Sequence, residues 1–189
     1  LLAGMALSAV CGAFSSFIVY FANNKEGMQT IAYWMMGSLA GAQWGELAVI
    51  APIIMASILF FWTQSRVLNL MLLGDESAIT MGTDLHAYRQ WYLLISSLIV
   101  GFAVYSAGMI GFVGLIVPHV IRMFTGPDHK RLLPVAALVG AIFLVVADGL
   151  CRVIIPHTEL PIGILISMIG APSFIYLMIK KTYGFGGSD

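Results

Sequence analysis

Residues 107–122 read Ala-Gly-Met-Ile-Gly-Phe-Val-Gly-Leu-Ile-Val-Pro-His-Val-Ile-Arg, and this stretch decides the fold class. Its glycines stand at positions 108, 111 and 114, and each costs about 1 kcal/mol relative to alanine inside a soluble helix. In a membrane the balance differs, because small residues let helix backbones approach and neighbouring groups satisfy the backbone freed by a proline. The stretch therefore predicts a helix packed among other membrane helices.

The overall composition indicates the same environment. Apolar residues make up 60% of the 189 residues, charged residues only 10%, and the mean hydropathy is +0.95, whereas soluble domains carry about 25% charged residues. The net charge is zero, which argues against a nucleic-acid partner. Cys11 and Cys151 lie in apolar runs, and we interpret them as packing residues. Because the chain starts inside an apolar run, we expect it to be part of a longer protein.

Six apolar runs can cross a bilayer, whose core needs about 20 helical residues, or fewer where other helices surround the span. They cover residues 1–21, 47–63, 91–107, 109–124, 133–151 and 161–179. The sequence thus predicts an all-α integral membrane fold with about six transmembrane helices in one domain over residues 1–189. Between the spans we expect a short outer helix and a cytoplasmic loop over residues 64–90.

Positive charges orient these spans. If all six runs cross and the chain start faces the cytoplasm, seven Lys and Arg residues lie inside and only Lys25 and Arg152 lie outside. The seven inside are Arg66, Arg89, Arg122, Lys130, Arg131, Lys180 and Lys181. If residues 109–124 do not cross, three lie inside and six outside. The positive-inside rule therefore favours six spans.

The outer loop, residues 23–46, is too polar to cross the bilayer. It contains Tyr33, Trp34, Met35 and Met36, which suit a short interfacial helix with an aromatic belt. A second interpretation places these four residues at the outer mouth of a substrate path. We interpret the methionines as adaptable packing residues rather than haem ligands.

The inner loop contains a second predicted short helix, bracketed by two glycines and with an acidic first turn that suits the helix dipole. It can either lie on the membrane surface or act as a coupling helix that docks in a groove of a partner protein. The candidate coupling residues are Gly74, Asp75, Glu76, Ser77, Ala78, Met81 and Gly82.

Few residues suggest chemistry. Asp148 and Arg152 lie four apart on one helical face, where they can pair and reduce each other's desolvation cost. The histidines show no spacing typical of a helical metal site, and the chain has no Walker A, Gly-x-Ser-x-Gly or His-Glu-x-x-His motif. We therefore predict no catalytic residues, no metal site and no cofactor.

Several motifs resemble the permease family of ATP-driven importers for iron chelates and cobalamin. The resemblance extends from Leu1 to Lys181, and its strongest parts are Gly111–Arg122, Thr125–Pro134, Ala147–Arg152, Glu159–Gly163 and Gly170–Pro172. Permeases of this family have about ten spans, so the chain would be the C-terminal six. Asp75 stands where the family more often has glutamate.

The resemblance implies a multi-pass transport subunit of the bacterial inner membrane that binds no ATP itself. Its cargo would be an iron-siderophore, haem or cobalamin, and its partners would be a second permease copy, a cytoplasmic ATPase subunit and a periplasmic or lipid-anchored binding protein. Segment 74–82 would meet the ATPase. Arg152 would either dock the binding protein or only pair with Asp148.

The alternative is a fragment of a secondary transporter driven by protons or sodium. Such proteins place ionisable groups at the middle of the membrane and break helices around them. Asp148 is the one acidic residue within the predicted spans and the possible candidate, and Arg152 is available to neutralise it.

Overall fold

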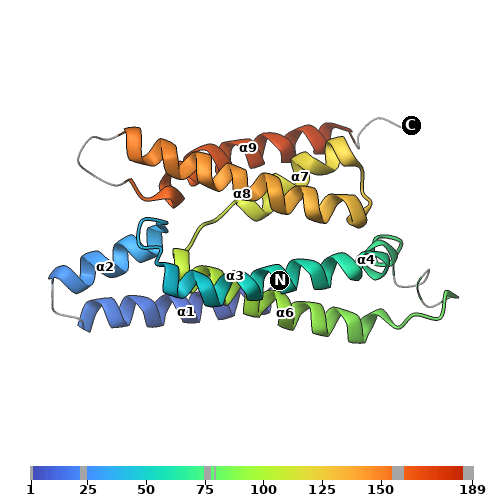
Figure 1. Ribbon diagram of the computed structural model, residues 1–189, viewed down its shortest axis with the longest axis horizontal. Coiled ribbons are helices and arrows are strands. Elements are labelled where there is room, and N and C mark those ends of the chain that lie inside the picture. The colour runs from blue at the N-terminus through green and yellow to red at the C-terminus, as the bar shows by residue number, and fades with distance from the viewer. Residues whose placement is uncertain (1, 22–24, 75–77, 79, 155–159, 185–189) are drawn as a thin grey trace.

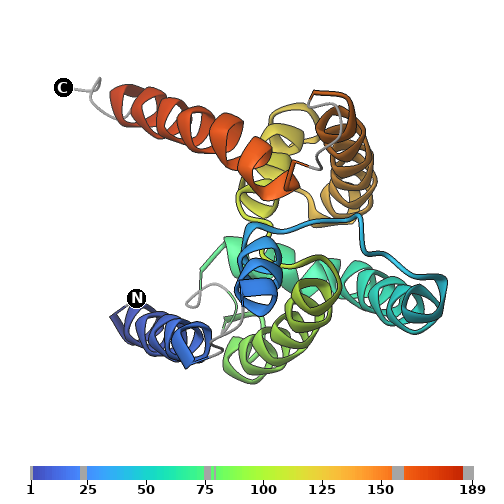
Figure 2. The same ribbon diagram turned by 90° about the vertical axis from the view of Figure 1, so that its left-hand side faces the viewer.

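The structure, a computed structural model, describes residues 2–21, 25–74, 78, 80–154 and 160–184, and their regular secondary structure is α-helical. The predicted all-α class is confirmed. The helices are α1 (Leu2–Phe21), α2 (Lys25–Met36), α3 (Trp44–Thr63), α4 (Ser65–Leu72), α6 (Leu85–Ala107), α7 (Val113–Thr125), α8 (His129–Ile154) and α9 (Ile162–Gly184). Figures 1 and 2 show two layers, with α7, α8 and α9 in one and α1, α3, α4 and α6 in the other.

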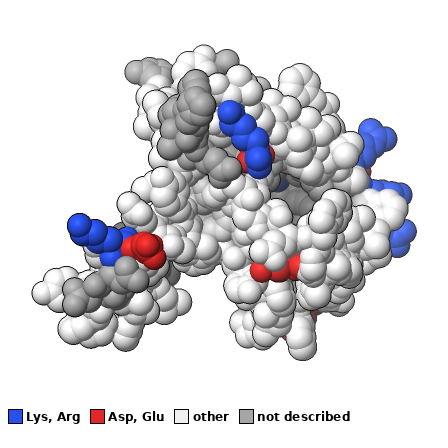
Figure 3. Space-filling model, turned by 60° about the vertical axis from the view of Figure 1, so that its left-hand side comes forward, with Lys and Arg blue, Asp and Glu red and all other residues white. Residues whose placement is uncertain are grey.

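Four of these helices, α1, α3, α6 and α8, are long and apolar enough to cross a membrane. Helix α7 and the described apolar part of α9, Ile162–Tyr176, are shorter. The 13 residues of α7 extend only about 20 Å, against about 30 Å for a bilayer core. Six spans therefore remain a prediction, while four membrane-length helices are observed. The face drawn in Figure 3 is mostly uncharged, as expected of a surface that meets lipid.

The glycine-rich stretch departs from the prediction at its start. We expected a span from Met109, but α7 begins at Val113. Gly108 and Phe112 have φ values of 70° and 64°, in the left-handed region that a right-handed helix does not use. Residues 108–112 therefore form a link between α6 and α7. Phe112 lies so close to α9 that a Cβ added at Gly170 would be 2.8 Å from the Phe112 Cβ.

Other helix boundaries differ for local reasons. Helix α6 begins at Leu85, six residues before the predicted span, because the Asp84 side chain caps it by accepting a 2.8 Å hydrogen bond from His86 N. Helix α2 lies where a short helix was expected. Helix α4 was not predicted, since we placed the helix of this loop after Gly74 rather than before it.

Packing is concentrated in the layer of α7, α8 and α9. Ala147 and Cys151 of α8 are buried against Ile162 and Ile166 of α9. A second cluster joins α7 and α8 through Val117, Ile121 and Leu132. In contrast, none of the residues of α1 is buried, and Figure 2 shows this helix set apart from the α7–α9 layer. The best-packed helix of the described chain is thus α8.

Candidate functional site

The predicted functional residues divide between two opposite ends of the bundle. Figure 1 shows α2, the end of α8 and the start of α9 at one end, which we call the α2 end. At the opposite end, the α4 end, lie α4, the end of α7 and the starts of α6 and α8. The two ends are described in turn.

At the α2 end, three glycines hold the end of α2 in direct backbone contact with other segments. We call Gly37, Gly108 and Gly163 the glycine clamp. A Cβ added at Gly163, the second residue of α9, would collide with the carbonyl oxygen of Met36. A Cβ added at Gly108 would collide with the carbonyl oxygen of Trp34. No other residue type fits at these two positions without moving backbone.

The third glycine of the clamp lies directly after α2. Gly37 has a φ of 75°, and an added Cβ would be 2.8 Å from the Met109 carbonyl oxygen. Glycine adopts this backbone conformation without steric cost. Two hydrogen bonds complete the join, from Ser38 N to the Ala107 carbonyl oxygen at 2.9 Å and from Met109 N to the Trp34 carbonyl oxygen at 3.3 Å. The end of α2 is therefore fixed to the 108–112 link and to α9.

The predicted path residues lie on the last turns of α2, next to this clamp. The side chains of Tyr33, Trp34, Met35 and Met36 are between 40% and 49% exposed. The clamp thus sets where four half-exposed apolar side chains stand, and their contact with a substrate stays a prediction.

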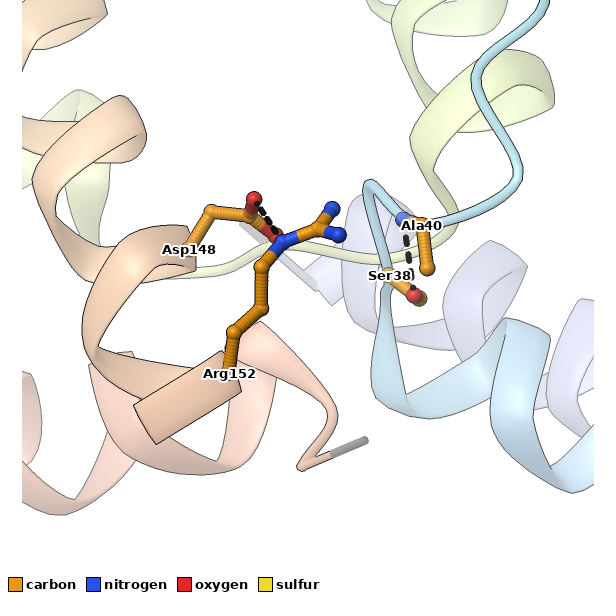
Figure 4. Close-up of polar contacts among 4 residues, drawn as sticks. All are labelled: Ser38, Ala40, Asp148 and Arg152. Carbon is orange, nitrogen blue, oxygen red and sulfur yellow. Dashed lines mark hydrogen bonds and ion pairs between the residues drawn. The ribbon is translucent and has the colours of Figure 1, made fainter. Parts of the chain in front are cut away.

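Asp148 and Arg152 form the predicted pair near the end of α8. Arg152 Nε donates to Asp148 Oδ2 at 2.8 Å, and the Arg152 side chain is still 51% exposed. Figure 4 shows the pair facing the turn at Ser38 and Ala40, where the Ser38 hydroxyl accepts a hydrogen bond from Ala40 N. The pair and this turn line one small cavity. The Arg152 side chain is thus half exposed while it pairs with Asp148.

At the α4 end, the candidate coupling segment is described in part. Asp75, Glu76 and Ser77 lie outside the described residues. Gly74 and Gly82 have φ values of 92° and 75°, as expected for glycines that bracket a short helical turn. Ala78 N donates to the Gly74 carbonyl oxygen, and Met81 N to that of Ala78. Ala78 is fully buried, whereas Thr80 is exposed and Met81 is 54% exposed, so Met81 is the large apolar side chain that the described part of the segment presents outward.

Next to this segment, Asn69 of α4 bridges to the start of α8. Its Nδ2 donates to Asp128 Oδ1 at 2.8 Å, and its Oδ1 accepts from His129 N at 2.9 Å. His129 Nδ1 lies 2.8 Å from the same Oδ1 and donates to it, because an amide oxygen only accepts. The carboxylate and the backbone N–H together fix the amide orientation. Neither Asn69 nor Asp128 was a predicted site residue.

Asp128 also caps α8. Its Oδ1 accepts from Lys130 N at 3.0 Å, and its carbonyl oxygen accepts from Leu132 N. The hydrogen bond from Asn69, followed by that from Lys130 N, lowers the pKa of the Asp128 carboxyl below its ordinary value. The carboxyl is therefore charged at neutral pH and accepts both bonds.

Two further side chains join helices at this end. Trp62, near the end of α3, donates its Nε1–H to the Lys130 carbonyl oxygen at 3.1 Å. The Tyr92 hydroxyl of α6 donates to Gln64 Oε1, between α3 and α4, at 3.1 Å. We call Trp62, Asn69, Asp128 and His129 the hydrogen-bonded corner. Across the described ranges there is no group of three His, Cys, Asp or Glu residues that could hold a metal ion.

Comparison with known proteins identifies relatives over nearly the whole chain. The FecCD transport family matches residues 1–180. The hemin transport system permease protein HmuU of Yersinia pestis is 41% identical over 181 residues, covering 96% of this chain and 54% of that protein. The cobalamin import system permease protein BtuC of Halobacterium salinarum is 41% identical over 178 residues, covering 94% of this chain and 47% of that protein. The chain spans about half the length of these curated relatives.

A solved structure shows the same fold. It is an inward-facing conformation assigned to a metal-chelate type ABC transporter, and it matches with a TM-score of 0.88 and 35% sequence identity. The match covers 95% of this chain and 58% of that chain. With its membrane-length helices and a family match over residues 1–180, this chain is a multi-pass membrane protein that belongs to the FecCD transport family.

Proposed function

We propose that this chain is part of the permease subunit of an ATP-driven importer in the bacterial inner membrane. Its cargo is an iron chelate, either haem or a siderophore complex, or cobalamin. The observation that supports this proposal is the 41% identity, over nearly the whole chain, to permeases named for hemin and for cobalamin. Because the two identities are equal, they favour neither cargo over the other.

In this proposal the permease provides the path and separate subunits provide the energy and the cargo. A cytoplasmic ATPase subunit hydrolyses ATP, a periplasmic or lipid-anchored binding protein delivers the cargo, and a second permease copy completes the path across the bilayer. The relatives are about twice as long as this chain. The complete ten-span permease would therefore contain spans in addition to the six that we predict in this chain.

The positions of two exposed side chains support this arrangement. Met81, 54% exposed at the α4 end, offers an apolar contact to the ATPase. Arg152, 51% exposed at the α2 end, offers a positive charge to acidic groups of the binding protein. A subunit that contacts one partner on each side of a membrane needs docking residues at opposite ends. The α4 end is then cytoplasmic and the α2 end faces outward, where Tyr33–Met36 stand at the mouth of the path.

A reconstituted importer tests the proposal. The full permease, its ATPase and its binding protein are placed in proteoliposomes, and uptake of haemin, of a ferric siderophore complex and of cyanocobalamin is measured with and without ATP. We expect ATP-dependent uptake of one of the three compounds. Uptake driven by a proton or sodium gradient without ATP would instead support the secondary transporter.

Met81→Glu tests the coupling contact in the same assay. A charge placed in an apolar docking groove remains without a partner, so ATPase affinity should fall by about tenfold to a hundredfold. Met81→Leu is the matched control, because it keeps the apolar volume and should bind the ATPase as the wild type does. Equal ATPase binding by both variants would remove Met81 from the interface.

A further inference from the structure

We propose that Asn69 is the positioning residue that transmits movement of the coupling segment to α8 during transport. The inference rests on the proposed function, because it concerns the step by which the ATPase moves the permease. No motif of the sequence marks Asn69, and the argument depends on the contacts of the hydrogen-bonded corner.

The first step concerns the place of Asn69 in the chain. Helix α4 ends at Leu72, and Gly74 opens the coupling segment directly after it. A displacement of that segment therefore reaches α4 through the single residue Leu73, as it reaches α6 at its other end through Thr83 and Asp84. Asn69 stands on α4 within about one and a half turns of Gly74, so it moves with the segment.

The second step concerns what Asn69 holds. Its amide makes three contacts of 2.8–2.9 Å with two consecutive residues, Asp128 and His129, at the start of α8. One contact is to the backbone N–H of His129, and another is to the Asp128 carboxylate that caps α8. The bridge therefore constrains the position of the first turn of α8 itself, not only of one side chain.

The third step concerns where α8 leads. This helix has 26 residues, about 39 Å at 1.5 Å per residue, and it is packed between α7 and α9. Its far end bears Arg152, the proposed docking residue for the binding protein. A helix of this length, packed along both ends, transmits a shift of its first turn to its last. The Asn69 bridge and α8 therefore link the coupling segment, which bears Met81, to Arg152 at the far end of α8.

The chemistry of the bridge needs an amide at position 69. Its N–H donates to a carboxylate while its oxygen accepts from two N–H groups, and one Asn side chain supplies both roles. Leucine has neither role, and aspartate would oppose the Asp128 carboxylate. Exchanging the partners, Asn69→Asp together with Asp128→Asn, removes the opposed carboxylates and restores a hydrogen bond between positions 69 and 128, with the amide at position 128 as donor. Because Asp128 Oδ1 accepts both from Asn69 Nδ2 and from Lys130 N, the exchange loses the bond from Lys130 N.

The experiment compares these variants in the complete reconstituted importer. Haemin, a ferric siderophore complex and cyanocobalamin are the probes, and three quantities are measured: ATPase affinity, ATP hydrolysis stimulated by the binding protein, and molecules taken up per ATP hydrolysed. For Asn69→Leu and Asn69→Asp we expect normal ATPase affinity but at least about fivefold less uptake per ATP, the lower end of measured coupling between sites. The exchanged pair should recover part of the lost uptake per ATP, because it restores the bond between positions 69 and 128.

Thr63→Ala is the matched control, since it removes a hydrogen bond at the same end that stays within α3. If Asn69→Leu lowers the unfolding temperature while uptake per ATP stays normal, Asn69 has only a structural role and the inference is wrong. If Asn69→Leu fails to assemble, the uptake per ATP of Asn69→Asp is compared with that of the exchanged pair. The inference is wrong if the exchanged pair takes up no more per ATP than Asn69→Asp does. A wild-type importer that moves none of the three probes with ATP would overturn the proposed function, and this inference with it.

Discussion

At the α2 end the segments meet backbone against backbone, whereas at the α4 end they meet through side chains. The glycine clamp leaves no room for a single methyl group between α2 and its neighbours. The hydrogen-bonded corner instead joins α3, α4 and α8 through an indole, an amide, a carboxylate and an imidazole. The two ends of one bundle therefore differ in how much they can adjust.

In the proposed importer, the difference favours movement at the α4 end. Backbone contacts without side chains have no alternative rotamers, so the clamp either forms or the segments separate. Side-chain hydrogen bonds contribute about 1 kcal/mol each and can break and form again during a conformational cycle. An importer driven from its cytoplasmic side needs the adjustable end next to the ATPase. The comparison supports the orientation with the α4 end inside, as the charge distribution predicts.

Gly163→Ala tests the rigid end and should have the largest effect. The added methyl group would collide with the Met36 carbonyl oxygen, and a backbone atom cannot move away cheaply. We expect a loss of about 3 kcal/mol or more, the upper range for overpacking, or failure to fold. Thermal unfolding of the detergent-solubilised permease and its yield in membranes measure this effect.

Gly149→Ala in α8 is the control for that experiment. It makes the same substitution inside a helix, but among the described residues no atom outside the nearby backbone of α8 lies within 4 Å of the added methyl group. Stability should be unchanged or slightly higher, because alanine favours a helix by up to about 1 kcal/mol over glycine. If both variants behave alike, the clamp is not a close backbone contact and the comparison between the two ends fails.

Arg152→Glu separates pairing from docking at the α2 end. The change places two carboxylates four residues apart on an exposed helical face, which costs only about 0.5 kcal/mol. If Arg152 docks the binding protein, affinity should fall about tenfold or more, and the salt dependence of association should decrease because a steering charge is reversed. A salt titration of binding-protein affinity measures this. Unchanged affinity at every salt concentration would leave Arg152 with the pairing role alone.

Trp62→Phe tests the adjustable end and should have the smallest effect. The variant loses the 3.1 Å hydrogen bond to the Lys130 carbonyl oxygen but keeps an aromatic ring, so we expect a loss of about 1 kcal/mol. Trp44→Phe, at a ring that is 87% exposed, is the control and should stay within about 0.5 kcal/mol of the wild type. A loss above about 3 kcal/mol for Trp62→Phe would mean that this corner is as rigid as the clamp.

The sequence predicted the features that depend on one segment at a time. Long apolar runs predicted membrane helices because a bilayer requires them, and α1, α3, α6 and α8 have that length. The bracketing role of Gly74 and Gly82 and the pairing of Asp148 with Arg152 are equally local, since each depends on residues a few positions apart.

Features that depend on distant pairs were not predictable from one sequence. We placed the start of this span at Met109, whereas α7 begins at Val113. The glycine spacing does not reveal that the Phe112 backbone has a positive φ or that Phe112 lies against Gly170 of α9. The glycine clamp combines Gly37, Gly108 and Gly163, and nothing in the sequence around each of them distinguishes it from the other glycines of the chain. Asn69 lies 59 residues before Asp128, and only the tertiary fold brings the two together.

The shortness of α7 has a consequence for the surrounding lipid. A helix about 20 Å long is some 10 Å shorter than the bilayer core that the neighbouring α8 can cross. Wherever α7 meets lipid, the hydrocarbon layer must thin locally or protein must cover the difference in height, and each ångström of mismatch has a modest energetic cost. At the α2 end, the 108–112 link continues the chain from the start of α7 to α6. We therefore expect the thermal stability of the permease to depend on the acyl-chain length of the surrounding lipid and to fall as the bilayer thickens.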